Sequence, residues 1–146
     1  PSAAGQSLLH IFEGFRTHAY QDVAGVWTIG YGFTYYADGS RVKQGDVISR
    51  EDADELFRHI LRPFEDTVYN SVLVPLNQNQ FDALVSLAYN IGRSAFNRST
   101  LVRVLNEGDY DEAASQFHRW NRAGGRIVPG LVNRRAREWE LFTKEP

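Results

Sequence analysis

The chain has 146 residues, of which 42% are hydrophobic and 23% are charged, and its formal net charge is −2. This length and composition fit one globular domain and exclude an intrinsically disordered chain, and the apolar runs are too short to span a membrane. The sequence has no cysteine, which excludes disulfide bonds, thiolate nucleophiles and cysteine-based zinc sites.

The first residues carry no basic segment followed by an apolar run, so we expect no signal peptide. Leu8, Phe12 and Phe15 have the i, i+4, i+7 spacing of an amphipathic helix, which we expect to end near Gly14. Glu13 then lies at the end of this helix, between two aromatic residues. Because an apolar setting disfavours an ionised carboxyl group, Glu13 is a candidate proton donor.

Residues 18–34 are aromatic and β-branched residues interrupted by glycines, which predicts a twisted β-hairpin or a small sheet. Thr28, Gly30 and Gly32 share one parity and leave one strand face nearly bare, which we interpret as a ligand floor, with a bulge as the alternative. Asp22 lies in a turn of polar and small residues, where we expect it to be ionised. The bulky residues of the other parity are expected in the core: Trp27, Ile29, Tyr31 and Phe33.

The next segment contains a turn signal, a strand and a helix start. Asp38-Gly39 predicts a hairpin turn before a third short strand around Val42. Ser49 is the predicted N-cap of a helix that continues through Ile60. Pro63 should kink or restart that helix.

The remainder of the chain is predicted to be helical. Asn77 with Gln80 resembles a capping box at the start of a helix that Gly92 ends. A small lobe of helix and sheet (about residues 1–62) is thus followed by a larger all-helical lobe (63–146), and we expect a site in the cleft between them. Further helices are expected near residues 100–105, 110–117 and 133–142.

Charge is unevenly distributed despite the small net value. Acidic residues crowd the segment 51–66, and the segment between Glu112 and Glu138 contains arginines but no acid. One interpretation is a solvated helix face; the other is a surface for an anionic polymer, either a cell envelope or nucleic acid. The arginines are Arg119, Arg122, Arg126, Arg134, Arg135 and Arg137.

Glu13 and Asp22 form a pair of carboxyl groups in contrasting settings. Glycoside hydrolysis needs such a pair, because one group protonates the leaving oxygen and the other supports the positive charge at the sugar carbon. Since most acidic residues are solvated or cap helices, the pair alone is weak support.

The spacing around this pair is more specific. Glu13, eight residues, Asp22, five residues, Thr28 and then the Ile-Gly-x-Gly of residues 29–32 resemble the signature of phage-type lysozymes, the endolysins of glycoside hydrolase family 24. The resemblance extends over nearly the whole chain. Its other matching segments are Glu13-Gly14-x-Arg16, Ala53-Asp54-Glu55-Leu56-Phe57, Tyr89-Asn90-Ile91-Gly92, Trp120 and Asn133-Arg134-x-Ala136-Arg137.

The resemblance implies a single lysozyme-like α+β domain that hydrolyses the β-1,4 bond between N-acetylmuramic acid and N-acetylglucosamine. Glu13 would be the general acid, Asp22 the general base or charge-stabilising carboxylate, and Thr28 would position the attacking water or Asp22. The family's inverting reaction would place the two carboxyl groups roughly 6.5–9.5 Å apart. Arg134 would reach the Glu13 carboxylate. The implied substrate-binding residues are Gly32, Thr34, Tyr89, Thr100 and Arg134.

The resemblance also implies a phage-encoded monomer that is made in the host cytoplasm and acts on the cell wall in the periplasm. Its partner would be the peptidoglycan glycan strand, with no cofactor, metal, nucleic acid or stable membrane insertion. Two features depart from this picture. Phe33 stands where the family usually has histidine. An arginine beside Glu13 would favour the ionised carboxylate and oppose its role as an acid.

Other functions stay open. A binding module without catalysis would not need all of Glu13, Asp22 and Thr28. A transglycosylase or a chitinase-type hydrolase on the same fold would differ in its products, and nucleic-acid binding would rest on the arginine-rich segment alone. The four histidines follow no metal-ligand spacing, which disfavours a zinc amidase.

Overall fold

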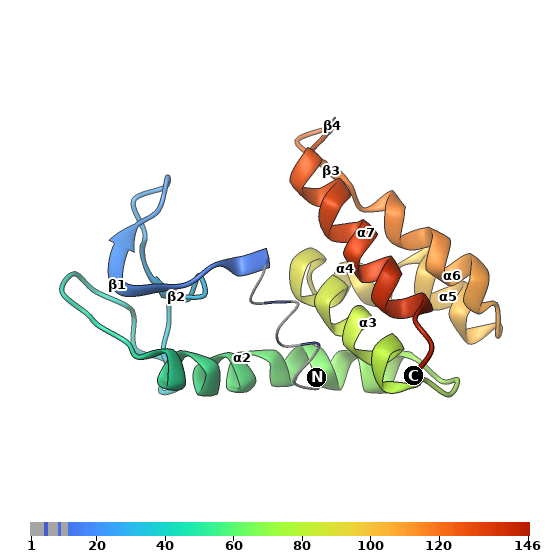
Figure 1. Cartoon of the computed structure of the whole chain (residues 1–146), viewed down its shortest axis with the longest axis horizontal. Helices are drawn as coiled ribbons and strands as arrows, with labels where there is room; N and C mark the ends of the chain where they lie inside the picture. The colour runs from blue at the N-terminus through green and yellow to red at the C-terminus, as the bar shows by residue number, and fades with distance from the viewer. Residues whose placement is uncertain (1–4, 6–8, 10–11) are drawn as a thin grey trace. The chain divides into compact units, whose positions relative to one another are not determined.

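The computed structural model describes Gly5, Leu9 and residues 12–146 (Figure 1). The chain forms two compact units. We call Ser7–Arg62 the sheet unit, and Pro1–Gln6 with Pro63–Pro146 the helical unit.

The first helix ends where the sequence predicts. Phe12 and Glu13 are helical, whereas Gly14 is not and has a φ of 70°. Because this backbone conformation suits glycine, Gly14 ends the helix directly after Glu13. Leu8, the first residue of the predicted apolar pattern, lies outside the described residues.

The sheet unit contains the predicted hairpin. Strands β1 (Arg16–Gln21) and β2 (Trp27–Gly30) pair antiparallel, with Tyr20 opposite Thr28 and an irregularity between Arg16 and Tyr20. The turn between the strands therefore spans residues 22–26.

The expected third strand around Val42 is wrong. An isolated bridge joins Tyr35 to Arg41 outside any named strand, so no ladder forms there. The predicted turn before it is confirmed: Gly39 has a φ of 85°, and its N–H donates to the Tyr36 carbonyl oxygen at 3.0 Å.

An aromatic cluster forms the core of the sheet unit. The ring of Tyr31 stacks on Phe57 with centroids 5.4 Å apart, and Phe33 meets Phe57 edge-on at 5.6 Å. Ile29 is also buried, so three of the four expected core residues are confirmed. Trp27 is only half-buried.

Helix α2 (Arg50–Ser71) begins with the predicted N-cap, because the Ser49 hydroxyl accepts the Asp52 N–H at 3.0 Å. Pro63 lies inside α2, which continues without a break, so the helix does not restart there. The same proline is the first residue of the second segment of the helical unit.

The helical unit is built around α3 (Gln78–Ile91), which packs against α7 (Pro129–Thr143) (Figure 1). The predicted capping box at Asn77 and Gln80 is present, and Gly92 ends α3 with a φ of 95°. The other elements of this unit are α4 (Arg93–Asn97), α5 (Thr100–Asn106), α6 (Tyr110–Gln116), the 3-10 helix η1 (Phe117–Arg119), β3 (Arg122–Ala123) and β4 (Arg126–Ile127).

Two features of this unit differ from the expectation. Strands β3 and β4 form a short hairpin, with Gly124 and Gly125 in its turn, between the helices predicted at residues 110–117 and 133–142, where no strand was predicted. Helix α7 begins at Pro129 rather than near Asn133, because proline suits the first turn of a helix.

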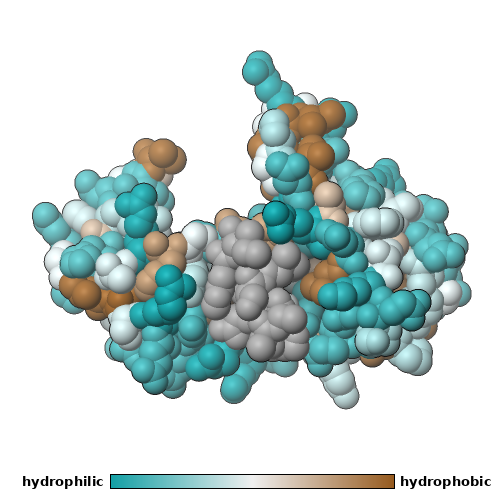
Figure 2. Space-filling view, viewed as in Figure 1, coloured by the Kyte–Doolittle hydropathy of each residue, from teal (hydrophilic) through white to brown (hydrophobic). Residues whose placement is uncertain are grey.

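The face shown in Figure 2 is mostly hydrophilic with separate apolar groups. Val23 in the turn between β1 and β2 is fully exposed, and the outer end of this hairpin is a hydrophobic spot in Figure 2. Within the described part of the chain, no helix combines the length and apolar character that crossing a bilayer requires.

Candidate active site

Asp22 occupies the first position of the turn between β1 and β2. Its Oδ1 accepts the backbone N–H groups of Ala24 at 2.8 Å and Val26 at 2.9 Å. Its own N–H donates to the Val26 carbonyl oxygen at 3.0 Å. These bonds fix an exposed carboxylate whose Oδ2 accepts no hydrogen bond from any described residue, so Oδ2 is available to water or a ligand.

Thr28 lies in β2 and is buried, with 5% of its surface exposed. Its hydroxyl donates to the Val26 carbonyl oxygen at 2.9 Å. Asp22 therefore holds the N–H of Val26 while Thr28 contacts its carbonyl oxygen. Because both side chains bind Val26, the hairpin fixes Asp22 and Thr28 relative to one another.

Glu13 is the last helical residue before Gly14 and is half-buried. The neighbouring Phe15 packs its ring against Tyr31 with centroids 5.0 Å apart, and the Arg50 guanidinium lies 4.4 Å from the Phe15 ring centroid. Glu13 thus joins the helix to a segment that is anchored on the aromatic core, and it belongs to the same unit as Asp22 and Thr28.

The predicted bare strand face is wrong at Gly30. This glycine is buried with a φ of 64°, and a Cβ added there would lie 3.0 Å from Cδ2 of Phe33. Gly30 therefore makes room for an aromatic ring of the core rather than for a ligand. Gly32 lies beyond the end of β2, is exposed and has no atom within 4 Å of an added Cβ, so its surface is open.

Phe33, in the position usually occupied by histidine, is 3% exposed. Its ring packs edge-on against Tyr31, with centroids 6.0 Å apart. The substitution gives the core an apolar contact, which suits a position without access to water. Thr34 follows it, is half-buried, and accepts the Val42 N–H at its carbonyl oxygen at 3.0 Å.

A polar contact that the sequence did not indicate ties this segment to α2. The Tyr31 hydroxyl donates to Asp54 Oδ1 at 2.6 Å, and Arg50 Nη1 lies 3.4 Å from the same hydroxyl. Burial, followed by the Asp54 hydrogen bond, raises the pKa of Tyr31, so the phenol stays protonated and keeps donating.

The other predicted site residues lie in the helical unit. Tyr89, near the end of α3, is half-buried and meets Phe64 edge-on at 5.2 Å. Thr100, the first residue of α5, lines a cavity of about 560 Å³ together with residues from the end of α2 and from 97 to 106. That cavity does not include Tyr89 or Arg134.

Arg134 lies in a buried polar cluster on α7. Its Nε donates to Glu138 Oε2 at 3.3 Å, and its Nη2 donates to the Ser86 carbonyl oxygen, also at 3.3 Å. The Ser86 hydroxyl donates to the same Oε2 at 2.5 Å. Neither Ser86 nor Glu138 has any exposed surface.

Arg135 completes this cluster and is likewise fully buried. Its Nη1 donates to Glu138 Oε1 at 2.5 Å, its Nε donates to the Trp120 carbonyl oxygen at 2.9 Å, and its Nη2 donates to the Asn90 side chain. Burial lowers the pKa of Arg135 and raises the pKa of Glu138, while their mutual attraction opposes both shifts. The hydrogen bonds to Glu138 favour its ionised form.

The interpretation of the arginine-rich segment as one surface is therefore wrong in part. Arg134 and Arg135 point into the protein and pair with Glu138, the acid that ends the segment. The i+3 and i+4 spacing of these residues was the sequence signal for such pairing. The remaining arginines are exposed: Arg119, Arg122, Arg126 and Arg137.

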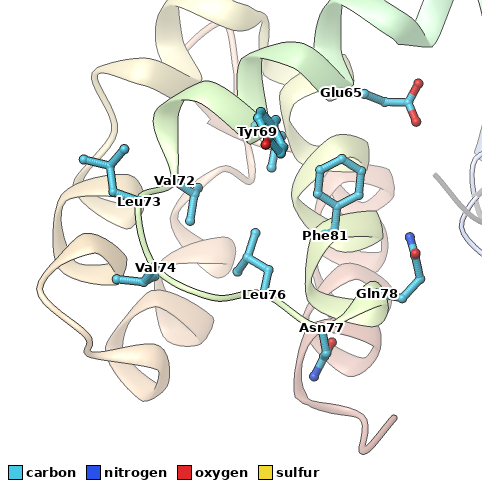
Figure 3. A pocket seen from close by; sticks show the side chains of 10 residues that line it. Glu65, Tyr69, Val72, Leu73, Val74, Leu76, Asn77, Gln78 and Phe81 are labelled. Atoms are coloured by element: carbon cyan, nitrogen blue, oxygen red, sulfur yellow. The ribbon is translucent and has the colours of Figure 1, made fainter.

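A groove of about 750 Å³ lies where α2 ends and α3 begins (Figure 3). Tyr69 and Phe81 are among its side chains, with Val72, Leu73 and Leu76 on the connecting segment. It contains none of the residues that the sequence predicts for catalysis or saccharide binding. Among the described residues, no group of three or more His, Asp or Glu side chains is arranged to hold a metal ion.

Comparisons with known proteins agree with this picture. The family model described as phage lysozyme matches residues 10–138. The endolysin of Bacillus phage PZA is 46% identical over 143 residues, which are 97% of this chain and 54% of that protein, so this chain spans about half the length of that relative.

Two solved structures are similar over nearly their whole length. A mutant of P22 lysozyme has a TM-score of 0.90 and 44% identity, covering 98% of this chain and 97% of that one. The muramidase domain of SpmX from Asticaccaulis excentricus has a TM-score of 0.84 and 41% identity, covering 99% and 97%. The lysozyme-like α+β fold is thus confirmed.

Proposed function

This chain belongs to the phage lysozyme family of glycoside hydrolases, and we propose that it cleaves the β-1,4 bond between N-acetylmuramic acid and N-acetylglucosamine in peptidoglycan. Its substrate is then the glycan strand of the bacterial cell wall. The similarity to a muramidase domain supports this choice of linkage.

Glu13 acts as the general acid in this proposal and protonates the leaving glycosidic oxygen. Asp22 acts as the general base, or stabilises the positive charge that develops at the sugar carbon. Thr28 positions the attacking water or Asp22. For an inverting reaction the two carboxyl groups stand roughly 6.5–9.5 Å apart, which leaves room for the water.

The observation that supports these roles most is the hydrogen bonding around Val26. Asp22 Oδ1 is held by two backbone N–H groups, and Oδ2 accepts no hydrogen bond from the described residues. A base needs an oriented oxygen with a free lone pair. The Thr28 hydroxyl uses its proton on Val26 and retains lone pairs that accept a hydrogen bond from water.

Saccharide binding involves residues of both units, which belong to one lysozyme domain in this proposal. Gly32 and Thr34 contribute from the sheet unit, where the open surface at Gly32 admits a ring close to the backbone. Tyr89, Thr100 and Arg134 contribute from the helical unit. The reaction needs no metal or cofactor, because two carboxyl groups supply the acid and the base.

The endolysin relatives support a biological setting for this proposal. In this proposal the protein is phage-encoded, acts as a monomer, is made in the host cytoplasm and degrades the wall from the periplasm.

The test is the release of muropeptides from purified murein by Glu13→Gln. Removal of the transferable proton should lower the rate at least about hundredfold while thermal unfolding stays unchanged. Asp22→Asn should be impaired to a similar degree, and Thr28→Ala less so. Glu51→Gln, an exposed carboxyl in the first turn of α2, is the control. Wild-type rates in Glu13→Gln would rule out Glu13 as the acid.

Mass spectrometry of the products distinguishes the related reactions. Hydrolysis gives reducing ends, whereas a transglycosylase gives anhydro ends. Cleavage of chitin in preference to murein would indicate a chitinase-type hydrolase. Binding to murein without any product would indicate a module that has lost catalysis.

A further inference from the structure

A polar cavity of about 560 Å³ in the helical unit has no part in the catalytic steps proposed above. It is lined by the end of α2 and by the segment from Asn97 to Asn106, and its volume is in the range of small-ligand sites. Of the nine described residues that line it, only Val102 is apolar and none is acidic. Thr100 is the only one of them that the proposed function uses, in saccharide binding.

Hydrogen bonds between the helices fix the walls of this cavity. The Asn106 amide of α5 donates through Nδ2 to the Ser71 carbonyl oxygen at 2.9 Å, and its Oδ1 accepts the Leu73 N–H at 2.7 Å. The Ser71 hydroxyl at the end of α2 donates to Oδ1 of Asn97. Because the walls are fixed before a ligand arrives, binding costs little conformational entropy.

Several hydrogen-bond donors of the cavity have no acceptor among the described residues. The Asn97 amide uses its oxygen on α2, while its Nδ2 donates to no described residue. The Asn70 side chain forms no hydrogen bond with a described residue. Arg98 donates only through Nε, to a backbone carbonyl oxygen at 3.4 Å, so both of its Nη groups can donate to a ligand.

The charge of the cavity selects an anion. Arg98 and Arg103 give its lining two positive charges, although the whole chain has a net charge of −2. Glu107, outside the lining, competes for Arg103, with 3.2 Å between the charged atoms. Both members of this pair are exposed, so the pair is weak, and it uses one of the five N–H donors of the guanidinium.

The arrangement of the donors favours a tetrahedral anion over a planar one. A carboxylate has two coplanar oxygens, which a single arginine can bind side by side. Here one guanidinium comes from the C-cap of α4 (Arg98) and the other from α5 (Arg103), and the amides of Asn70 and Asn97 come from α2 and α4. Donors from three elements suit a phosphate group, whose acceptor oxygens point in several directions.

We propose that this cavity binds a phosphate group on a hydroxylated carrier, the chemistry of the polyol-phosphate polymers of bacterial cell walls. Arg98 and Arg103 bind the phosphate oxygens, and the amides of Asn70 and Asn97 bind the remaining oxygens or the hydroxyl groups of the carrier. The site anchors the protein to its surroundings. It is independent of the proposed hydrolysis, whose acid and base belong to the sheet unit.

The test is a titration of the ¹⁵N-labelled protein with inorganic phosphate, followed by NMR at about pH 8, where phosphate is mostly dianionic. Chloride at the same ionic strength is the reference. We expect saturable shifts of the backbone amides of residues 97–106. Arg98→Gln with Arg103→Gln should weaken the affinity at least about tenfold, because two charged hydrogen-bond donors are lost.

Two matched variants separate this site from net charge. Arg122→Gln with Arg126→Gln removes the same charge from exposed positions of the same unit and should leave the affinity unchanged. Asn70→Asp keeps the shape of the side chain but adds a negative charge, so it should also weaken binding. Shifts that do not saturate, equal losses in both arginine pairs, or wild-type affinity in Asn70→Asp would overturn the proposal.

Glu107→Gln tests the competition at Arg103. The substitution frees the guanidinium from its carboxylate, so phosphate should bind about twofold tighter. Weaker binding in this variant would show that the intact ion pair, rather than a ligand, is what Arg103 serves.

The carrier is identified with poly(glycerol phosphate). Tighter binding per phosphate than for inorganic phosphate, lost in Arg98→Gln with Arg103→Gln, would assign the site to the wall polymer. Equal affinity would assign it to free phosphate. Release of muropeptides from purified murein should be unchanged in this double variant, so a failure of the phosphate site and a failure of Glu13 as the acid give different results.

Discussion

Two features of Gly30 disfavour any side chain at this position: its positive φ and its close packing on the Phe33 ring. Its φ is 64°, and an added Cβ would lie 3.0 and 3.1 Å from two carbons of the Phe33 ring. Positive φ costs an L-residue about 1–2 kcal/mol, and overpacking a core adds to this. We therefore expect Gly30→Ala to lower the free energy of unfolding by about 2–4 kcal/mol in urea denaturation.

Gly32→Ala is the matched comparison. Gly32 also has a positive φ, 92°, but an added Cβ there would meet no atom within 4 Å. Only the backbone strain applies, so the expected loss is about 1–2 kcal/mol. Equal losses at the two glycines would contradict the close packing of Gly30 on Phe33.

The two glycines also mark a limit of sequence interpretation. Strict alternation places residues 28, 30 and 32 on one face only while the chain stays extended. Strand β2 ends at Gly30, whose left-handed conformation breaks the alternation. The positions of Asp22 and Thr28 were predictable, because both depend on contacts within one short hairpin.

Among the elements, the loop of residues 36–46 has its first and last residues joined by a side-chain hydrogen bond. The Tyr36 hydroxyl donates to Asp46 Oδ2 at 2.7 Å. The Lys43 N–H, followed by this phenol, holds the pKa of Asp46 below its usual value. Burial, followed by the bond to Asp46, raises the pKa of Tyr36 to about 12.

These pKa shifts predict that the Tyr36–Asp46 bond stabilises the fold over a range of pH and that this stabilisation is lost at both acid and alkaline pH. The contribution of Asp46 is present above pH 3.8 and is lost as the pH falls through its lowered pKa. The contribution of Tyr36 is intact below pH 10 and is lost as the pH rises through about 12. The phenolate absorbance of Tyr36, taken in pH jumps as the difference between the wild type and Tyr36→Phe, should titrate near 12.

Asp46→Asn provides the control for this assignment. It removes the charge that opposes phenolate formation, so the midpoint should move back toward 10. A wild-type midpoint near 10 would show that the Tyr36–Asp46 bond is absent in solution.

Elements with a local chemical signal were predictable and those without one were not. The capping box at Asn77 and the end of α3 at Gly92 depend on residues within four positions of each other. Strands β3 and β4 have two residues each, all exposed, so no alternation of burial marks them. They lie between the helices predicted at residues 110–117 and 133–142, where no strand was predicted.

For the whole molecule, the family signature predicted the fold class, whereas composition and periodicity did not define it. The contact between Ser86 and Glu138 was beyond sequence interpretation, since the two residues are 52 positions apart in the chain. Sequence patterns of helical period indicate which residues share a helix face, but not which buried polar groups meet across helices.

The exposed arginines lead to a prediction for binding to the whole cell wall. Arg122 and Arg126 lie on the β3–β4 hairpin and are exposed, so their charge should attract an anionic wall. In the Glu13→Gln background, replacing both by glutamine should weaken co-sedimentation with murein sacculi about threefold to tenfold at low salt. The difference should vanish at high salt, because surface charges are screened.

The control removes the same charge from the other unit. Arg58 and Arg62 of α2 are exposed, and their replacement by glutamine changes the net charge equally. If both double variants lose affinity to the same degree, net charge alone explains the attraction and the hairpin has no special part in it.

The two hydrogen bonds to Val26 explain why five residues separate Asp22 from Thr28 in the family signature. Asp22 accepts the N–H of Val26 and Thr28 donates to its carbonyl oxygen, so both contacts depend on the number of residues between Asp22 and Thr28. The identities of residues 23 and 24 can change as long as their number is kept, whereas Gly25 has a φ of 79°, which favours glycine. A single inserted residue would break this arrangement and misalign the Asp22 carboxylate and the Thr28 hydroxyl together, even if the rest of the chain folds normally.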